Sequence, residues 1–318
     1  MTKSSKRSVD IRVCCHQILA VSLCGYVPAN TEALHYRPMY NEPVIPFRRA
    51  GHSVAIQLLY RMCFHDKVVL ITGASSGIGA ACSLKFAKSS ALLSLIGRNE
   101  ENLTNTANKC EELSGLKPLI IVADITMDED VQRIVSETIN RYGQIDVLIN
   151  NAGVSSIEGI QKEMDAYDHI MATNARGTYH LTNEVIPYLI KTKGNIINIS
   201  SILSMKPLPI MTAYCMSKAA IDMATKCLAL KLGSTGVRVN AVNPGPVKTD
   251  MFKRSGLTEE GITQMLAAVE MNAPLKKITQ VENVAELVKF LASDKANCVT
   301  GCCYVIDCGI SLGDDGKY

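Results

Sequence analysis

The sequence predicts an α/β protein with one doubly wound domain, in which a seven-stranded parallel sheet carries helices on both faces. Three observations support this prediction. From residue 66 onward, short apolar runs typical of strands alternate with longer segments of helical period. These runs are continuously apolar, as expected for parallel strands that are covered on both faces. The first run leads directly into a glycine-rich turn and a helix, and right-handed crossovers then wind the sheet in both directions.

The first half of this region supplies four strands. The run from Val68 to Ile71 precedes the glycine turn and its helix, and a second strand is expected at 91–96. A polar helix is expected at 100–113, and a third strand at 118–123 ends beside Asp124. The apolar spacing of Val131, Ile134 and Ile139 predicts a helix over 129–142, which a fourth strand follows at 145–149.

The second half supplies three more strands between longer helices. A single long helix is expected over 167–190, followed by a strand at 194–200. A helix over 213–232 leads to a strand at 237–242. After a loop and two helical patterns, a short strand at 303–307 closes the series. The whole region, 65–318, is therefore expected to form a single domain.

Composition excludes several classes of protein. Of 318 residues, 47% are apolar and 20% are charged, which describes a globular chain with a full core. A net charge of +3 is too small to indicate a nucleic acid partner. The 12 cysteines form no Cys-x-x-Cys pair, and the cluster from Cys298 to Cys308 has no histidine nearby. We interpret them as mostly buried, reduced thiols in a cytoplasmic protein, with a zinc or disulfide site as the alternative.

Residues 1–64 differ from the remainder and are interpreted as an N-terminal extension. The stretch has no clear period and contains Pro28, Pro38, Pro43 and Pro46. Basic residues precede a mild apolar run over 13–27, which faintly resembles a targeting peptide. Polar residues interrupt this run, and it is shorter than the ~20 apolar residues that span a bilayer. We expect no integral membrane segment and a disordered or targeting extension.

The glycine-rich turn predicts a phosphate-binding site. Gly73, Gly77 and Gly79 separate the first strand from its helix. This arrangement presents free backbone N–H groups and the positive end of the helix dipole, while glycine allows close approach. Three residues separate the first two glycines, against one in the Gly-x-Gly-x-x-Gly dinucleotide fingerprint. The alternative is a glycine-rich turn that binds nothing.

Polar residues follow the third, fourth and fifth strands, at Asp124, Asn150 and Ser201. Ligands of doubly wound sheets bind at the carboxyl ends of the strands, so these side chains are expected in one cleft. Asn150 has an alternative role, in which it only ties two strands together. Tyr214 and Lys218 share one helix face, and a nearby ammonium group lowers the pKa of a phenol. Such a pair arises readily by chance, but a hydroxyl at Ser201 gives it a partner that can bind a substrate oxygen.

Short motifs recur in order along residues 66–318, namely Thr72-Gly-Ala-Ser-Ser-Gly-Ile-Gly79, Asp124, Asn150-Asn-Ala-Gly153, Asn174, Ser201, Tyr214-Cys-Met-Ser-Lys218 and Asn243-Pro-Gly-Pro-Val-Lys-Thr249. In these motifs the chain resembles the short-chain dehydrogenase/reductase family in its compact branch of about 250 residues. Within the family, the motifs are most similar to the 3-oxoacyl-(acyl carrier protein) reductase-like group. The Rossmann fold of that family agrees with the predicted sheet. Cys308 departs from the usual Asp-Gly-Gly, which affects only the last turn.

The resemblance implies hydride transfer between a nicotinamide cofactor and a carbonyl/alcohol pair. Tyr214 would exchange the proton and Ser201 would orient the oxygen. Lys218 would hold the nicotinamide ribose and lower the pKa of Tyr214. Asn174 would hold a water in a proton relay, and Asp124 would accept from the adenine amine. The implied cofactor-binding residues are Gly73, Ser75, Ser76, Gly77, Ile78, Gly79, Arg98, Asn99, Asp124, Ile125, Asn151, Ala152, Gly153, Tyr214, Lys218, Pro244, Gly245, Val247 and Thr249.

The residues after the second strand predict the choice of cofactor. In this fold, an acidic residue there binds the ribose 2′-hydroxyl and repels a 2′-phosphate. Here Gly97 carries no carboxylate, and Arg98 can pair with a phosphate. We therefore expect NADP(H) to be preferred over NAD(H). The alternative is that Arg98 is a solvated side chain.

The expected substrate is a lipophilic ketone or a 3-oxoacyl compound, which would make the protein a carbonyl reductase. Apolar residues occur in the segments 155–159, 202–211 and 251–271, which would face the reaction centre, although many of them are expected to pack in the core. The apolar candidates are Ile202, Leu203, Met205, Leu208, Met251, Phe252 and Leu257.

The resemblance also implies a homodimer or homotetramer. The second hypothesis for the function is a catalytically silent NADP-binding regulator or scaffold.

Overall fold

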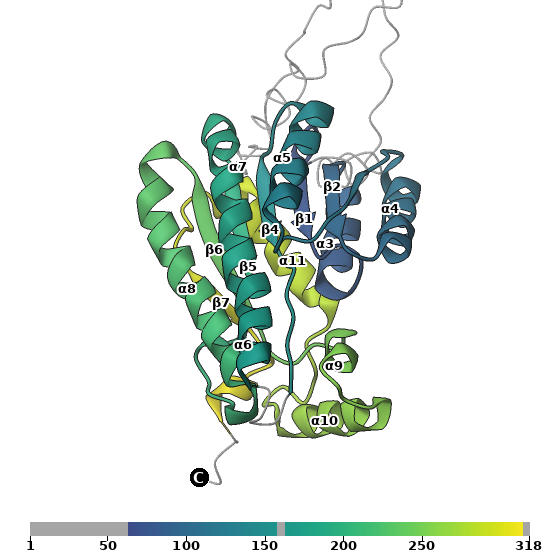
Figure 1. Ribbon diagram of the computed structural model, residues 1–318, viewed down its shortest axis with the longest axis vertical. Coiled ribbons are helices and arrows are strands. Elements are labelled where there is room, and N and C mark those ends of the chain that lie inside the picture. The colour runs from purple at the N-terminus through teal and green to yellow at the C-terminus, as the bar shows by residue number, and fades with distance from the viewer. Residues whose placement is uncertain (1–62, 158–162, 314–318) are drawn as a thin grey trace, which may run out of the picture. The chain divides into compact units, whose positions relative to one another are not determined.

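The computed structural model describes residues 63–157 and 163–313. Its seven strands form one sheet in the order β3-β2-β1-β4-β5-β6-β7, and every pairing is parallel (Figure 1). The chain winds outward in one direction from β1 and in the other from β4, so the topological switch lies between these two strands. The predicted fold class is confirmed.

The strands are short and separated by helices, as the apolar pattern predicts. The strands are β1 Val68–Thr72, β2 Leu92–Gly97, β3 Leu119–Val122, β4 Val147–Asn150, β5 Asn195–Ile199, β6 Arg238–Pro244 and β7 Cys303–Ile306. The helices are α3 Gly77–Ala87, α4 Glu100–Ser114, α5 Asp128–Tyr142, α6 Glu163–Met171, α7 Thr178–Thr192, α8 Thr212–Leu232, α9 Met251–Arg254, α10 Glu259–Asn272 and α11 Val281–Ala292.

Two separate apolar clusters cover the two faces of the sheet. On one face, Phe86 of α3, Leu103 of α4 and Val288 of α11 pack against the strands. On the other face, helices α5, α7 and α8 supply residues such as Val185 and Leu228 (Figure 1). The strands β1, β4 and β5 are buried along their whole length between these clusters, whereas Val122 of β3 and Val305 of β7 are exposed at the two edges of the sheet. This burial explains why its strands are continuously apolar.

The long helix expected over 167–190 is interrupted. A π-helical turn at Ala172–Gly177 separates α6 from α7. Such turns insert an extra residue into the helix and frequently occur at functional sites. Gly177 lies so close to the Ile125 backbone that an added Cβ would meet that carbonyl oxygen at 2.5 Å. The helical period continues through the insertion, so the sequence pattern alone does not reveal it.

Most of the predicted N-terminal extension, residues 1–62 of 1–64, lies outside the described residues. Phe64 already belongs to the core, because its ring packs edge-on against Phe86 with centroids 4.8 Å apart. Within the described part of the chain, no helix combines the length and apolar character needed to cross a membrane.

The interpretation of the cysteines as mostly buried is wrong for those that the structure describes. All nine are free thiols, but only Cys82 and Cys110 are buried, and burial raises the pKa of each to about 12. Cys298 and Cys302 are exposed because they precede β7, which forms an edge of the sheet. The sequence does not reveal which strand lies at the edge.

Candidate active site

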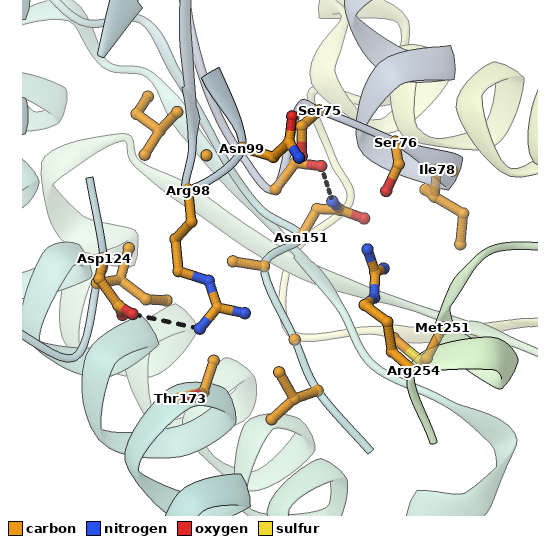
Figure 2. Close-up of a pocket in the computed structure, with 18 of the residues that line it drawn as sticks. Ser75, Ser76, Ile78, Arg98, Asn99, Asp124, Asn151, Thr173, Met251 and Arg254 are labelled. Carbon is orange, nitrogen blue, oxygen red and sulfur yellow. Dashed lines mark hydrogen bonds and ion pairs between the residues drawn. The ribbon is translucent and has the colours of Figure 1, made fainter. Parts of the chain in front are cut away.

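A cavity of about 400 Å³ opens at the carboxyl ends of β1 to β4, beside the topological switch (Figure 2). This size is within the range of small-molecule sites. The structure therefore brings together residues from six separate segments of the chain. The predicted cofactor-binding residues that line it are Gly73, Ser75, Ser76, Gly77, Ile78, Arg98, Asn99, Asp124, Ile125, Asn151, Ala152, Gly153 and Thr249.

Other predicted cofactor-binding residues lie outside this lining, namely Gly79, Tyr214, Lys218, Pro244, Gly245 and Val247. Gly245 packs against Asp307, and Val247 pairs with Thr279. Sequence reasoning missed Ile96, Ala123, Val154, Thr173 and Arg254, which do line the cavity. Ala123, Val154 and Thr173 directly adjoin predicted site residues and could have been found by extending the motifs, whereas Ile96 lies two residues before Arg98. Arg254 belongs to no motif.

The glycine turn adopts the geometry that a phosphate cradle requires. Gly73 and Gly77 have positive φ values of 64° and 54°. A Cβ on Gly79 would lie 2.2 Å from the Gly73 carbonyl oxygen, so glycine is required there for close packing rather than for contact with a ligand. Helix α3 begins at Gly77 with no acidic residue in its first turn, and the hydroxyl of Ser76 does not cap it. The N–H groups of that turn therefore face the cavity with the dipole unopposed.

The turn is held by hydrogen bonds from the loop after β4. The Asn151 amide donates to the carbonyl oxygens of Thr72 and Gly73 at 2.9 and 3.1 Å. The Thr72 hydroxyl accepts from the backbone N–H groups of Asn151 and Ala152, each at 3.0 Å. The donors of the Asn151 amide are thus used to fix the turn.

Arg98 and Asp124, predicted to contact different parts of a dinucleotide, contact each other. The Arg98 guanidinium donates to the Asp124 carboxylate at 3.3 Å, as Figure 2 shows. Partial burial acts to raise the pKa of Asp124, but hydrogen bonds from Thr126 and the charge of Arg98 together hold this pKa below its ordinary value. Arg98 remains 55% exposed, and its charge is partly balanced before any ligand is bound.

The three predicted catalytic residues Ser201, Tyr214 and Lys218 lie together. The Ser201 hydroxyl is hydrogen-bonded to the Tyr214 phenol, and the Lys218 Nζ lies over the Tyr214 ring, 5.6 Å from its centroid. All three side chains are buried. A Cβ on Gly153, which lines the cavity, would lie 3.6 Å from Lys218 Nζ. The predicted catalytic group therefore lies directly behind one wall of the cavity.

The predicted lowering of the Tyr214 pKa is wrong for the structure. Burial raises the pKa of Tyr214 to about 12, and the hydrogen bond from Ser201 opposes this rise without cancelling it. Burial also lowers the pKa of Lys218 to about 8, against the charge of Asp222. The Lys218 ammonium donates to the Ile199 carbonyl at 2.8 Å. Desolvation outweighs the attraction that the spacing suggests, so the phenol is protonated near neutral pH.

Two asparagines hold the surrounding elements in position. Asn174, in the π-helical turn, exchanges hydrogen bonds with the Val154 backbone at 2.8 and 2.9 Å and donates to Ser217 at 3.0 Å. Its predicted role in a water relay stays a prediction. Asn150 donates to Thr182 and to Asn198 of β5, each at 2.9 Å. The alternative interpretation of Asn150, as a tie between strands, agrees with these contacts.

The loop that carries Ser201 is supported from β6. The Asn243 amide lies 3.1 Å from the Ser201 carbonyl oxygen, 3.0 Å from the Ser204 hydroxyl and 2.8 Å from the Asp222 carboxylate. Asp222 is buried one helical turn after Lys218. Ser201 is therefore positioned through a buried polar network that reaches α8.

The expected apolar substrate wall is only partly present at the cavities. A second cavity of about 350 Å³ adjoins the first and has a mixed lining, in which Ser155, Asp165 and His169 are polar and Val154 and Met251 are apolar. Met251 lines both cavities, whereas the candidates from 202–211 line neither of these two. Residues 158–159 of the first predicted segment lie outside the described residues.

Comparisons with known proteins agree with this architecture. A family model described as enoyl-(acyl carrier protein) reductase matches residues 73–311. The chain is 36% identical over 255 residues to the 3-oxoacyl-[acyl-carrier-protein] reductase of Thermotoga maritima, covering 79% of this chain and 100% of the relative. It is 38% identical over 253 residues to the L-xylulose reductase of Caenorhabditis elegans, covering 78% and 97%. A Caenorhabditis elegans short-chain dehydrogenase/reductase of unknown function, solved with cofactor, aligns with a TM-score of 0.76 and 30% identity over 80% of this chain and 98% of that chain.

Proposed function

The chain belongs to the short-chain dehydrogenase/reductase family of nicotinamide-dependent oxidoreductases, and from this premise we propose that it is an NADP-dependent carbonyl reductase. In this proposal, it interconverts a lipophilic ketone or 3-oxoacyl compound and the corresponding secondary alcohol. The observation that carries the proposal is the buried contact of Ser201 with Tyr214, beside the Lys218 ammonium and directly behind the cavity wall. A domain over 65–318 would contain the complete site.

The residues present fit a nicotinamide dinucleotide. The glycine turn allows close approach, the N–H groups at the start of α3 suit a pyrophosphate, and the cavity continues toward β2 and β3. Ser75, Ser76 and Ile78 would hold the phosphates, with Thr249 at the nicotinamide end. When bound, the cofactor would supply or accept the hydride.

The chain's own residues would manage the proton. With its pKa raised to about 12, the Tyr214 phenol is protonated near neutral pH and can donate its proton to a carbonyl oxygen as that oxygen gains charge. The Ser201 hydroxyl would orient the same oxygen. A Lys218 ammonium with a pKa of about 8 is mostly charged at neutral pH, which favours the phenolate that the donation leaves. Asn174 would position Val154 and Ser217 beside this group.

The preference for NADP rests on the end of β2. Gly97 provides no carboxylate to repel a 2′-phosphate, and Arg98 extends into the cavity beside Asn99. A phosphate there would accept from the guanidinium, in competition with Asp124. NAD(H) is the alternative cofactor.

The proposed substrate class rests on apolar side chains in the segment after Ser201 and in and after α9. Met205 and Leu208 are exposed in the segment that follows it, and Phe252 and Leu257 are partly buried in and after α9. Exposed apolar side chains beside a polar catalytic group are suited to a lipophilic carbonyl compound.

We also propose a homodimer or homotetramer, because α8 exposes an apolar stripe. Met216, Ala220, Met223, Cys227 and Leu230 recur at helical spacing and are all exposed, with Leu230 at 87%. A second copy of the chain packed on this face would cover them. The free thiols that the structure describes agree with a reducing, cytoplasmic location.

The test is an assay of the purified chain with NADPH or NADH and a panel of ketones, 3-oxoacyl thioesters and sugars. We expect loss of reduced-cofactor absorbance with NADPH and a lipophilic carbonyl compound. Tight NADPH binding without turnover across the panel would instead support the silent regulator or scaffold. Turnover by Tyr214→Phe at the parent rate would refute the mechanism.

A further inference from the structure

Helix α9 and its flanking residues are attached to both sides of the cavity mouth. On one side, the Thr249 methyl group lies 3.0 Å from the position of a Cβ on Gly77, so this segment packs on the glycine turn. On the other side, Ser255 is hydrogen-bonded to Ser155 in the loop after β4. Between these attachments, Met251 and Arg254 are three residues apart on one helix face, and both line the cavity.

The phosphate cradle has no cation of its own. The stretch from Thr72 to Gly79 contains no charged residue. Among the described residues that line the cavity, the positively charged ones are Arg98 and Arg254. Arg98 lies at the end of β2 and is paired with Asp124. The charge that balances a pyrophosphate in the glycine turn must therefore come from the dipole of α3 alone or from Arg254.

Arg254 has the placement that this role requires. Figure 2 shows its guanidinium extending toward Ser76, Ile78 and Asn151, on the opposite side of the cavity from Arg98. Within the described part of the chain, no carboxylate forms an ion pair with it. The adjacent Lys253 is not in the cavity lining and forms an ion pair with Glu259. Of two neighbouring cations in α9, only Arg254 faces the cavity without a counter-charge.

We propose that Arg254 binds the pyrophosphate of the dinucleotide, and thereby holds α9 over the bound cofactor. This inference rests on the proposed function. Two N–H groups of a guanidinium match two oxygens of a phosphate, so the contact is directional as well as electrostatic. The competing assignment is an anionic substrate, because Arg254 also lines the second cavity. The orientation of the guanidinium toward the glycine turn favours the pyrophosphate.

Fragments of the cofactor separate the two arginines. ADP-ribose carries the pyrophosphate without a 2′-phosphate, and 2′-AMP carries the 2′-phosphate without a pyrophosphate. The affinity of the purified full chain for NADPH, ADP-ribose and 2′-AMP is measured by calorimetry for the parent and for Arg254→Gln, Arg254→Lys, Lys253→Gln and Arg98→Gln. Thermal unfolding of each variant checks that it is folded.

We expect Arg254→Gln to weaken ADP-ribose and NADPH binding roughly 10- to 100-fold and to leave 2′-AMP binding unchanged. Arg254→Lys should retain part of the affinity, because it keeps the charge but loses the paired donors. Lys253→Gln should bind all three ligands as the parent does. Arg98→Gln should show the reverse pattern, with 2′-AMP weakened and ADP-ribose unchanged.

Two outcomes overturn the inference, and they are distinguishable. If Arg254→Gln binds ADP-ribose as the parent does, Arg254 does not contact the pyrophosphate, although the proposed function stands. An increase in the substrate KM of that variant would then assign Arg254 to an anionic substrate. If the parent itself binds neither ADP-ribose nor NADPH, the proposed function and the inference fail together.

Discussion

The Arg98 guanidinium lies 3.3 Å from the Asp124 carboxylate, so two residues expected to bind different parts of a cofactor are paired with each other. We expect this ion pair to influence which cofactor binds, because both residues line the cavity. A 2′-phosphate has to compete with Asp124 for the Arg98 guanidinium, and it gains a charge-assisted hydrogen bond when it replaces the carboxylate. An uncharged ribose 2′-hydroxyl cannot replace the Asp124 carboxylate as an ionic partner of Arg98. The proposed preference for NADP therefore depends on one exposed side chain, that of Arg98.

Replacement of Arg98 by glutamine should remove that selectivity. We expect NADPH binding to weaken by about 10- to 100-fold, the range of a hydrogen bond to a charged group, and NADH binding to change by less than about threefold. Calorimetric dissociation constants for both cofactors test this, with NADH as the internal control. An equal loss for both cofactors would mean that Arg98 supports the cavity rather than recognising the phosphate.

Replacement of Tyr214 by phenylalanine should abolish turnover without loss of cofactor binding. The substitution keeps the buried ring and removes only the hydroxyl that contacts Ser201. A positioned proton donor typically contributes about 100- to 10,000-fold, so kcat should fall by at least about 100-fold. Steady-state kinetics and NADPH affinity are measured together. A kcat within about threefold of the parent would exclude Tyr214 as the proton donor.

The sequence predicts the sheet and the cavity lining better than it predicts the electrostatics. Continuous apolar runs identify the strands, because parallel strands that are buried on both faces carry apolar residues at nearly every position. The sequence reveals the glycine turn and Asp124 because their motifs are local. It does not reveal Arg254, because the place of this side chain depends on how Thr249 and Ser255 fix α9 beside the cavity. It also gives the wrong direction for the pKa of Tyr214, because residue spacing indicates proximity and not desolvation, which dominates for a buried phenol.

The buried Lys218 should make the free energy of unfolding rise with pH in the alkaline range. Burial lowers its pKa from 10.5 to about 8 in the folded chain. Between these values the unfolded chain binds the proton and the folded chain does not, so the free energy of unfolding should rise by up to about 1.4 kcal/mol per pH unit. Tyr214 acts oppositely above pH 10, because its pKa rises from 10.0 to about 12 on folding and the folded chain keeps the proton longer.

The Lys218 contribution is isolated by comparison with Lys218→Met. Urea unfolding of both proteins at about pH 7.5, 8.5 and 9.5 and constant ionic strength gives the difference in free energy at each pH. We expect the parent to gain stability relative to the variant as the pH rises through about 8. A difference that is flat across this range would mean that Lys218 keeps its ordinary pKa and is not desolvated.

Replacement of Gly79 by alanine should disrupt the glycine turn by a clash with the Gly73 backbone. A Cβ at this position would lie 2.2 Å from the Gly73 carbonyl oxygen and 2.5 Å from the Asn151 Nδ2, the pair joined by one of the hydrogen bonds that hold the turn. Overpacking against backbone costs about 1–3 kcal/mol or more, and the displaced Gly73 should also weaken NADPH binding. Gly233→Ala is the matched control, because nothing lies within 4 Å of its added Cβ, and its unfolding midpoint and NADPH affinity should stay close to those of the parent. If both substitutions were equally mild, the close approach of Gly79 to Gly73 would not be what shapes the cradle.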